Sequence, residues 1–264
     1  MDGKAIVITS GKGGVGKTTS TANIGTGLAQ LGKEVVLIDA DIGLRNLDVV
    51  MGLENRIVYD IVDVVEENCR LEQALIKDKR YSSLSLLPAA QTRDKTAVSK
   101  EQMVEVCKRL KAEADYVLID CPAGIEQGFQ NAIAGADEAI IITTPEVAAI
   151  RDADRVIGML QAEGLGEPEV IINRIRMDMV NKGDMMDIED MIEILAIKLL
   201  GVVPDDQEIV ISTNKGEPII LDDSNSQSAQ AFKNIVHRLE GEKIPLMSLE
   251  EGFMEKFKRI LGLG

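Results

Sequence analysis

The stretch from Gly11 to Thr18 constrains this chain more than any other. It reads GKGGVGKT and fits the phosphate-loop pattern G-x-x-x-x-G-K-[ST]. Residues 5–9 before it are apolar and partly β-branched, which predicts a buried strand, and residues 18–31 after it carry apolar positions at helical spacing. In a strand, glycine-rich turn and helix of this kind, backbone N–H groups and a helix N-terminus surround a phosphate.

The side chains of this loop predict an ATP site. Lys17 should reach the β- and γ-phosphates, and the Thr18 hydroxyl should ligate Mg²⁺. A second lysine, Lys12, stands where the pattern accepts any residue. On spacing alone it is either a solvated loop lysine or an extra cation for the phosphates. The predicted ATP-binding residues of the loop are Gly11, Lys12, Gly13, Gly14, Val15, Gly16, Lys17, Thr18 and Thr19.

Strand and helix patterns alternate along the chain, which predicts a doubly wound α/β fold with a mainly parallel sheet and helices on both faces. We expect an ATPase domain over 1–240, a linker over 241–248 with a helix-breaking proline, and an amphipathic helix over 249–264. The predicted strands are 4–9, 34–39, 84–87, 115–120, 138–144, 168–173 and 199–203. The predicted helices are 17–31, 57–67, 71–76, 99–113, 126–134, 150–163, 187–197, 205–213 and 225–240.

The composition argues against several classes of protein and several kinds of site. A net charge of −15 argues against a broad nucleic-acid surface, so we expect no nucleic-acid partner. The three cysteines have no C-x-x-C spacing and there is one histidine, which argues against a disulfide framework and a zinc site and fits a reducing cytosol. The N-terminus has no signal-peptide pattern, and no apolar run approaches the ~20 residues that span a bilayer.

Acidic residues follow two predicted strands, at the edge where parallel sheets bind ligands. Asp39 and Asp41 stand at i and i+2 on an extended segment and face the same side. Asp120 closes the strand 115–120, and Gly124 follows it in a loop that could move a backbone N–H onto a γ-phosphate. Carboxylates at this edge suit Mg²⁺ or the orientation of an attacking water. Acidic caps of a strand-terminal turn are the alternative for the first pair.

A second polar group follows the strand 168–173. The amide of Asn173 offers a donor and an acceptor to an adenine edge, and a turn-forming asparagine is about equally compatible with the spacing. Pro204, Asp205 and Asp206, after the next strand, would then flank the base. Cys121, beside Asp120, is predicted to be a small core residue because no histidine is available to activate it.

Several segments resemble the MinD/ParA family of ATPases with a deviant Walker A loop: GKGGVGKTT, DADIGLRNLD, DCPAGIE, TTPE, RDADR and GEPI, within residues 4–223. The resemblance is densest to the cell-division branch of that family, and closest to its Gram-positive type. It implies that Lys12 crosses a nucleotide-sandwich dimer to the partner's ATP, and that Asp41 positions the lytic water. The catalytic set implied is therefore Lys12, Lys17 and Asp41.

The resemblance also implies the remaining roles. It favours contact of Asn173 with the nucleotide base over the alternative of a turn-forming asparagine. The implied Mg²⁺ residues are Thr18, Asp39 and Asp120. The implied switch residues are Asp39, Asp41, Gly43, Asp120, Pro122 and Gly124. The implied surface for a MinC-like division inhibitor is Arg151, Asp152 and Asp154, although a solvated charged helix face is nearly as compatible with that stretch.

The last segment carries the strongest membrane signal. From residue 253, apolar residues recur at i, i+1, i+4, i+7 and i+8, which gives one stripe on a helix with basic residues beside it. This mixture is typical of an interfacial helix on anionic lipids, whereas docking on the protein's own core or a coiled-coil seam is the alternative. The predicted membrane-binding residues are Phe253, Met254, Lys256, Phe257, Lys258, Arg259, Ile260, Leu261 and Leu263.

These features together predict an ATPase that forms a homodimer with ATP, lies at the inner face of the cell membrane and recruits a division inhibitor. Whether its positional partner is a MinE-like activator or a polar adaptor stays open. A ParA-like DNA-partition ATPase and a flagellar-number regulator are the alternatives. An iron–sulfur carrier on the same loop would need paired bridging cysteines, and none are placed for it.

Overall fold

The computed structural model describes residues 3–222 and 226–247, and a single sheet runs through them. Its strand order is β3-β4-β2-β5-β1-β6-β7-β8. β3 pairs antiparallel with β4, and the other neighbours are parallel. The strands are β1 (Lys4–Thr9), β2 (Val35–Asp39), β3 (Ile76–Lys77), β4 (Leu84–Leu87), β5 (Tyr116–Asp120), β6 (Glu138–Thr143), β7 (Glu169–Ile175) and β8 (Lys198–Pro204).

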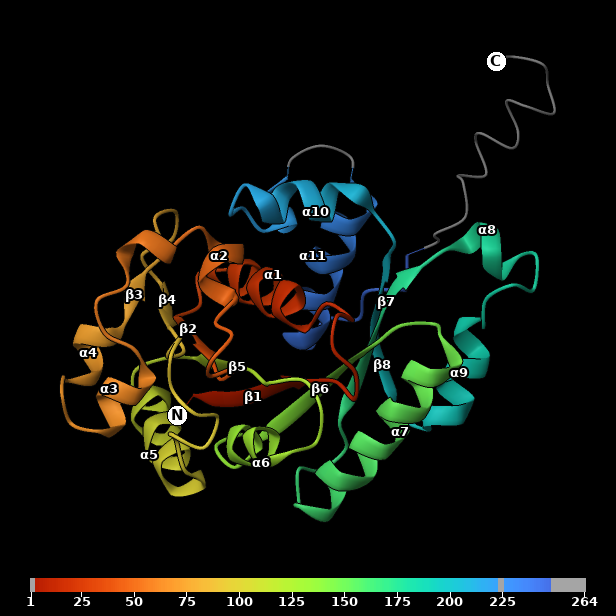
Figure 1. The fold of residues 1–264 in the computed structure, drawn as a ribbon. Coiled ribbons are helices and arrows are strands. Elements are labelled where there is room, and N and C mark those ends of the chain that lie inside the picture. The colour runs from red at the N-terminus through yellow and green to blue at the C-terminus, as the bar shows by residue number, and fades with distance from the viewer. Residues whose placement is uncertain (1–2, 223–225, 248–264) are drawn as a thin grey trace.

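Helices cover both faces of the sheet (Figure 1). One face carries α1 (Lys17–Gln30), α2 (Leu47–Met51), α10 (Gln207–Asn214), α11 (Gln227–Leu239) and the 3-10 helices η1 (Glu54–Arg56) and η2 (Ile219–Leu221). The other carries α3 (Ile61–Val65), α4 (Leu71–Ala74), α5 (Lys100–Lys111), α6 (Gln127–Ile133), α7 (Val147–Ala162), α8 (Met177–Val180) and α9 (Ile188–Leu195). The doubly wound α/β prediction is confirmed.

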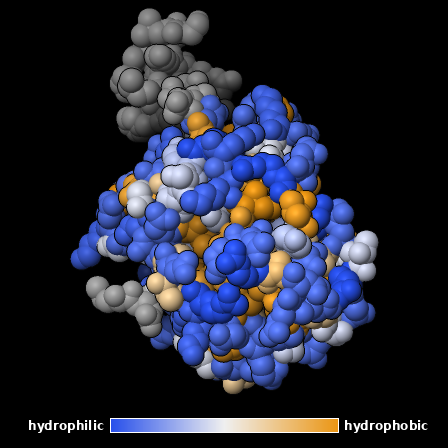
Figure 2. Space-filling model, turned by 90° about the vertical axis from the view of Figure 1, so that its left-hand side faces the viewer, coloured by the Kyte–Doolittle hydropathy of each residue, from blue (hydrophilic) through white to orange (hydrophobic). Residues whose placement is uncertain are grey.

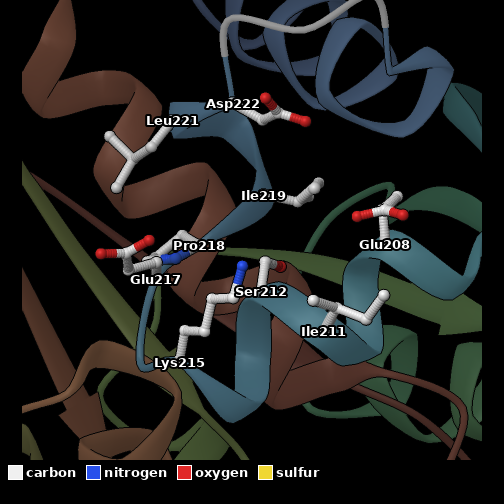
Figure 3. Close-up of a pocket in the computed structure, with 9 residues that line it drawn as sticks. All are labelled: Glu208, Ile211, Ser212, Lys215, Glu217, Pro218, Ile219, Leu221 and Asp222. Atoms are coloured by element: carbon white, nitrogen blue, oxygen red, sulfur yellow. The ribbon is translucent and has the colours of Figure 1, made fainter.

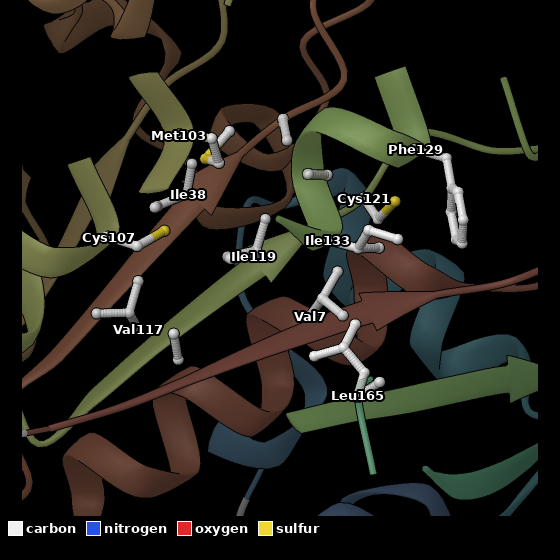
Figure 4. Close-up of a cluster of buried hydrophobic side chains, with 14 of the residues drawn as sticks. Val7, Ile38, Met103, Cys107, Val117, Ile119, Cys121, Phe129, Ile133 and Leu165 are labelled. Carbon is white, nitrogen blue, oxygen red and sulfur yellow. The ribbon is translucent and has the colours of Figure 1, made fainter. Parts of the chain in front are cut away.

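Alternation along the strands divides the hydrophobic core in two. In β1, Val7 belongs to the core under α5, α6 and α7, whereas Ile6 and Ile8 belong to the core under α1 and α11. Figure 4 shows the first core, where side chains of three strands meet Met103 and Cys107 of α5 and Phe129 of α6. Each such fully buried apolar side chain contributes roughly 1.5–3 kcal/mol.

The cysteines agree with their predicted character. Cys107 and Cys121 are buried in that core and Cys69 is half-buried, and all three are free thiols. Burial raises the pKa of the Cys121 thiol to about 12. Cys121 is therefore a packing residue, as expected.

The structure corrects several predicted elements. The helix predicted at 57–67 is only α3, which begins where Asp60 accepts N–H groups of Val62 and Asp63. The short elements α2, α8, η1 and η2 stand where no helix was predicted, and β3 begins at Ile76, inside the helix predicted at 71–76. The predicted strand 168–173 continues to Ile175. Most of these differences involve short elements.

The surface in Figure 2 is mostly hydrophilic, with hydrophobic side chains gathered in hollows near the middle of that face. Within the described ranges, the chain has no helix that is both long enough and apolar enough to cross a bilayer. The predicted amphipathic helix 249–264 lies outside the described residues, so every predicted membrane-binding residue does too.

Candidate functional site

The phosphate loop, residues 10–17, joins β1 to α1. Gly14 and Gly16 have φ angles of +78° and +100°, in the left-handed region that glycine tolerates. A Cβ on Gly16 would lie 2.3 Å from Nδ2 of Asn173. Over residues 3–222 and 226–247, no protein acceptor takes up the N–H groups of residues 13–16. Open donors at a helix N-terminus form an anion-binding site.

The two lysines of the phosphate loop lie in different surroundings. Lys17 is the first residue of α1 and is only 8% exposed. Its positive charge lowers the pKa values of Asp41 and Asp120, so it lies close to both carboxylates. Lys12 is exposed, and its Nζ lies 3.1 Å from Oε2 of Glu146, just before α7. Lys17 therefore faces the candidate site, whereas Lys12 is held at the surface.

Asp39 organises the loop that follows β2, residues 39–47, which we call the acidic loop. Its carboxylate accepts the N–H groups of Asp41 at 3.0 Å, Asn46 at 3.1 Å and Leu47 at 3.1 Å. The last two bonds cap α2, whose own N-cap residue makes no side-chain cap. Asp39 is thus a structural cap as well as a predicted Mg²⁺ residue.

Asp120 lies opposite Asp39 in the β2–β5 register, and both side chains are buried. Burial raises the pKa of Asp39 to about 6 and that of Asp120 to about 7. The neighbouring charge of Asp39 contributes to the raised pKa of Asp120, whereas the Thr18 hydrogen bond and the charge of Lys17 oppose the rise. Thr21 also donates to Asp120 at 3.4 Å. Two buried carboxylates side by side form a strongly anionic site.

This donor set fits Mg²⁺. The Thr18 hydroxyl and the Asp120 carboxylate lie together, and Asp39 lies opposite Asp120 in the β2–β5 register. Within the described part of the chain, no cluster of three or more His, Cys, Asp and Glu side chains could form an all-protein metal cage. Mg²⁺ characteristically takes one or two protein oxygens and completes its shell with phosphates and water. The residues present therefore suit that ion better than zinc.

Asp41 has an oxygen that accepts no hydrogen bond from the residues that the structure describes. Its Oδ1 is buried and has no hydrogen-bond partner in the described chain. Burial raises the pKa of Asp41, and the charges of Lys95 and Lys17 oppose that rise. A buried, unpartnered acceptor near Lys17 can orient a water molecule towards a bound phosphate.

The other predicted switch residues differ in how closely the surrounding atoms hold them. Gly43, with φ +94°, donates its N–H to Ala90 O at 2.8 Å, so the acidic loop is fixed there. Gly124, with φ +91°, has no other atom within 4 Å of the position of a Cβ. Pro122 packs against Gly128 at the start of α6. The loop after β5 therefore has space around Gly124.

A cavity of about 290 Å³ adjoins the phosphate loop at the ends of β7 and β8. Asn173 lines it, but its Nδ2 donates to Val15 O at 2.8 Å and its Oδ1 accepts the N–H of Arg174 at 3.0 Å. Asn173 thus braces the phosphate loop, which the spacing did not predict. The cavity is lined by Gly16, Thr19, Asn173, Arg174, Pro204, Asp205, Asp206, Ile209 and Val210.

Three of these lining residues were missed at the sequence level: Arg174, Ile209 and Val210. Their position depends on how α10 folds back over the end of β8. A second cavity of about 290 Å³ lies across α10, between that helix and η2 (Figure 3). Its side chains include Ile211 and Lys215, and it contains no predicted site residue.

The predicted partner surface begins beside the phosphate loop. Arg151 and Asp154 are exposed on α7, and Asp152 is half-buried between them. A Cβ on Gly11 would lie 2.5 Å from the backbone of Asp152. The structure therefore brings the phosphate loop and this face of α7 together.

Comparison with known proteins agrees with this geometry. A family model described as "ParA: NUBPL iron-transfer P-loop NTPase" matches residues 3–240. The septum site-determining protein MinD of Bacillus subtilis is 58% identical over 266 residues, covering 99% of each chain. A MinC:MinD cell division protein complex from Aquifex aeolicus has a TM-score of 0.86 at 52% identity, covering 92% of this chain and 98% of that chain.

A third relative carries a ligand. The septum site-determining protein MinD from Pyrococcus horikoshii, complexed with Mg-ADP, has a TM-score of 0.82 at 31% identity and covers 91% of this chain and 99% of that chain. The match to the family model spans most of the chain, and the first relative matches it nearly end to end. The chain therefore belongs to the MinD/ParA family of P-loop NTPases, enzymes that use a nucleotide together with Mg²⁺.

Proposed function

We propose that this protein hydrolyses ATP to switch its own membrane binding, and so controls where the division septum forms. The observation that carries the hydrolytic part is the unpartnered Oδ1 of Asp41, buried near Lys17 and the open amides of the phosphate loop. The relatives named for septum site determination support the cell-division part. A complex of MinC with MinD in a similar structure supports a MinC-like inhibitor as partner.

Each residue of the site has a role in phosphoryl transfer. The amides of residues 13–16 and the ammonium of Lys17 bind the phosphates, and Asp41 orients the attacking water and receives its proton. Thr18 and Asp120, with Asp39 behind them, would hold Mg²⁺. When bound, that ion neutralises charge on the β- and γ-phosphates. Nucleotide base and ribose would occupy the cavity beside Asn173.

Dimerisation is the step we assign to Lys12. Its exposed side chain is held by an ion pair in which both groups are largely in water, 48% and 61% exposed. Surface ion pairs of this kind are worth about 0–1 kcal/mol, so little opposes its transfer to a phosphate of a second subunit. Two subunits joined through ATP would then each contribute one cation to the other's site.

Membrane binding would follow from dimerisation. A single short interfacial helix binds reversibly, whereas two on one dimer gain avidity of about 10²–10⁴ because the second contact is intramolecular. ATP would therefore place the protein on the inner face of the cell membrane, and hydrolysis would return it to the cytoplasm. The face of α7 with Arg151, Asp152 and Asp154 would receive the inhibitor and a positional factor, either MinE-like or a polar adaptor.

The test is sedimentation with anionic liposomes in ATP and in ADP, together with ATPase turnover with and without those liposomes. We expect sedimentation in ATP only, a dimer in ATP by size-exclusion chromatography, and loss of sedimentation by Phe257→Glu. Phe257→Leu is the matched control, because it keeps an apolar side chain at the same position and should sediment like the wild type.

Three outcomes would refute the proposal. Equal sedimentation in ATP and ADP would remove the nucleotide switch. Turnover that survives Asp41→Ala would remove Asp41 from its assigned role. A salt-dependent shift of DNA by the ATP form, without lipid binding, would favour a partition ATPase instead.

A further inference from the structure

The chain turns back sharply at the end of α11. Gly241 adopts φ +87° and donates its N–H to Arg238 O at 2.9 Å, and Glu242 donates to His237 O at 3.0 Å. This pair of bonds is a Schellman motif, which ends a helix and reverses the chain. His237 Nδ1 also lies 2.7 Å from Oε1 of Glu242. The residues after α11 are therefore directed back along the helix instead of away from the domain.

Arg238 clamps the returning segment. Its Nε donates to Ile244 O at 2.8 Å and its Nη2 to Pro245 O at 2.7 Å. Its Nη1 donates to Leu200 O at 2.9 Å. Leu200 belongs to β8, the last strand of the sheet, beside which α11 lies in Figure 1. One guanidinium thus joins the helix, the sheet edge and the segment after the helix through three carbonyl oxygens.

The clamped segment stays in contact with the domain to its described end. Met247 is half-buried and packs against the core cluster under α1 and α11. Pro245 and Leu246 are exposed, so the segment lies on the surface of the domain. Residues 241–247, expected to be a linker, therefore have a fixed course. Any free connection to the predicted membrane helix can begin only at residue 248.

We propose that Arg238 is a positioning residue that fixes the point from which the membrane-binding segment leaves the domain. This inference rests on the proposed membrane function. In a dimer, two fixed exit points hold the second segment close to the bilayer once the first has bound. A short connection of this kind gives a high effective concentration for the second contact.

Loss of the clamp would lengthen the connection. Releasing residues 241–247 adds seven residues, which at ~3.5 Å each is up to about 25 Å of extra reach. The effective concentration falls roughly as the −3/2 power of connection length, so lengthening a short connection by seven residues lowers it by about tenfold or more. Avidity of the ATP dimer for membranes should fall by the same factor.

The experiment compares Arg238→Ala and Arg238→Lys with two matched variants. Lys233→Ala removes a cation from the same helix outside the clamp. Insertion of seven Gly and Ser residues after Met247 lengthens the connection while it leaves the clamp intact. Hydrogen exchange of residues 242–247 reports on the clamp directly, and liposome titration in ATP reports on avidity.

We expect Arg238→Ala to speed exchange over 242–247 and to weaken ATP-dependent liposome binding about tenfold, with ATPase turnover in solution unchanged. Arg238→Lys should do the same in part, because an ammonium lacks the planar fork that reaches three carbonyls. The insertion should weaken binding equally with normal exchange, and Lys233→Ala should match the wild type.

Two results would overturn the inference: exchange over 242–247 that is unchanged in Arg238→Ala, or liposome binding that is unchanged in both Arg238→Ala and the insertion. A wild type that fails to bind liposomes in ATP would instead refute the proposed membrane function and, with it, the role given to the clamp. Exchange and binding are separate readouts, so the two failures are distinguishable.

Discussion

The phosphate loop and the acidic loop occupy equivalent places but are shaped by different means. Each follows a central strand that pairs with β5. The phosphate loop takes its form from glycines at positive φ, and its N–H groups at 13–16 stay open within the described chain. In the acidic loop three N–H groups are already bound by one carboxylate, that of Asp39.

The two loops therefore differ in what their shape depends on. The phosphate loop is shaped by its backbone conformation and by the uncharged brace of Asn173, so it is ready for an anion before any ligand arrives. The acidic loop is shaped by a buried charge next to Asp120, so its hydrogen bonds depend on the charges gathered at that point. We therefore expect the first loop to be sensitive to shape and the second to charge.

The largest effect should come from breaking the shape of the phosphate loop. Gly16→Ala places a Cβ 2.3 Å from Nδ2 of Asn173 at a φ of +100°. The left-handed strain alone is about 1–2 kcal/mol, and Asn173 must also move away from Val15. We expect nucleotide affinity, measured by calorimetry, to fall by about 100-fold or more.

The control is Gly158→Ala, in the middle of α7, where a Cβ has no other atom within 4 Å. That change should raise stability slightly, by about 0.5–1 kcal/mol, and leave affinity unchanged. Wild-type affinity in Gly16→Ala would contradict the claim that backbone shape sets this loop.

Asp39→Asn tests the acidic loop by changing charge at constant shape. An amide accepts at only one of its two terminal atoms, so at least one of three N–H groups loses its acceptor. A buried donor left unpaired costs about 1–3 kcal/mol. We expect faster hydrogen exchange at residues 41, 46 and 47 and a lower melting temperature.

Asp60→Asn is the matched control. Asp60 caps α3 with one oxygen, Oδ1, that accepts the N–H groups of Val62 and Asp63. An asparagine caps as well as an aspartate, so stability should hardly change. Equal losses in the two variants would show that the acidic loop has no special dependence on a full carboxylate.

Acid should stabilise the nucleotide-free protein through the same charges. The pKa values of Asp39, about 6, and Asp120, about 7, are raised above the unfolded value of about 3.9, so the folded state binds more protons in this range. The destabilisation by these two buried charges is present above their folded-state pKa values, and it is relieved as the pH falls through those values. We expect the melting temperature to rise by a few degrees from pH 8 to pH 6.

Asp120→Asn should flatten that rise, because it removes one of the two buried charges. A melting temperature that falls between pH 8 and pH 6 in the wild type, or a slope untouched by the substitution, would contradict the electrostatic account of the acidic loop.

The smallest effect is expected at the surface of the phosphate loop. Glu146→Gln removes the ion pair with Lys12, whose two side chains are 48% and 61% exposed. Because water screens such a pair, thermal unfolding should shift by less than about 0.5 kcal/mol. A larger loss would show that the ion pair of Lys12 also shapes the loop, against the view that the glycines and the Asn173 brace are sufficient.

The sequence predicted the elements whose signals are local. The phosphate loop with Lys17, and Asp120 at the end of β5, were placed correctly because their patterns lie within a few consecutive residues. The short helix α2 was missed because its cap comes from Asp39, eight residues before Leu47. Residues 47–51 themselves do not predict a helix, because the cap that begins it is a carboxylate from outside this stretch.

Contacts between distant parts of the chain could not be predicted in the same way. Lys12 and Glu146 are 134 residues apart, and Asn173 reaches Val15 across 158. Asn173 was expected to face the base, and its second function as a brace for the phosphate loop follows only from the order β1-β6-β7 in the sheet. The clamp at Arg238 likewise depends on which strand forms the sheet edge.

The tight packing of Gly11 on Asp152 has one more consequence. Not even a methyl group fits between them, so the two backbones are in direct steric contact. A shift of α7 towards the loop by a fraction of an ångström must displace Gly11, the first glycine of the phosphate loop. A protein bound to the outside of α7 could thus change the geometry around the γ-phosphate without touching the nucleotide.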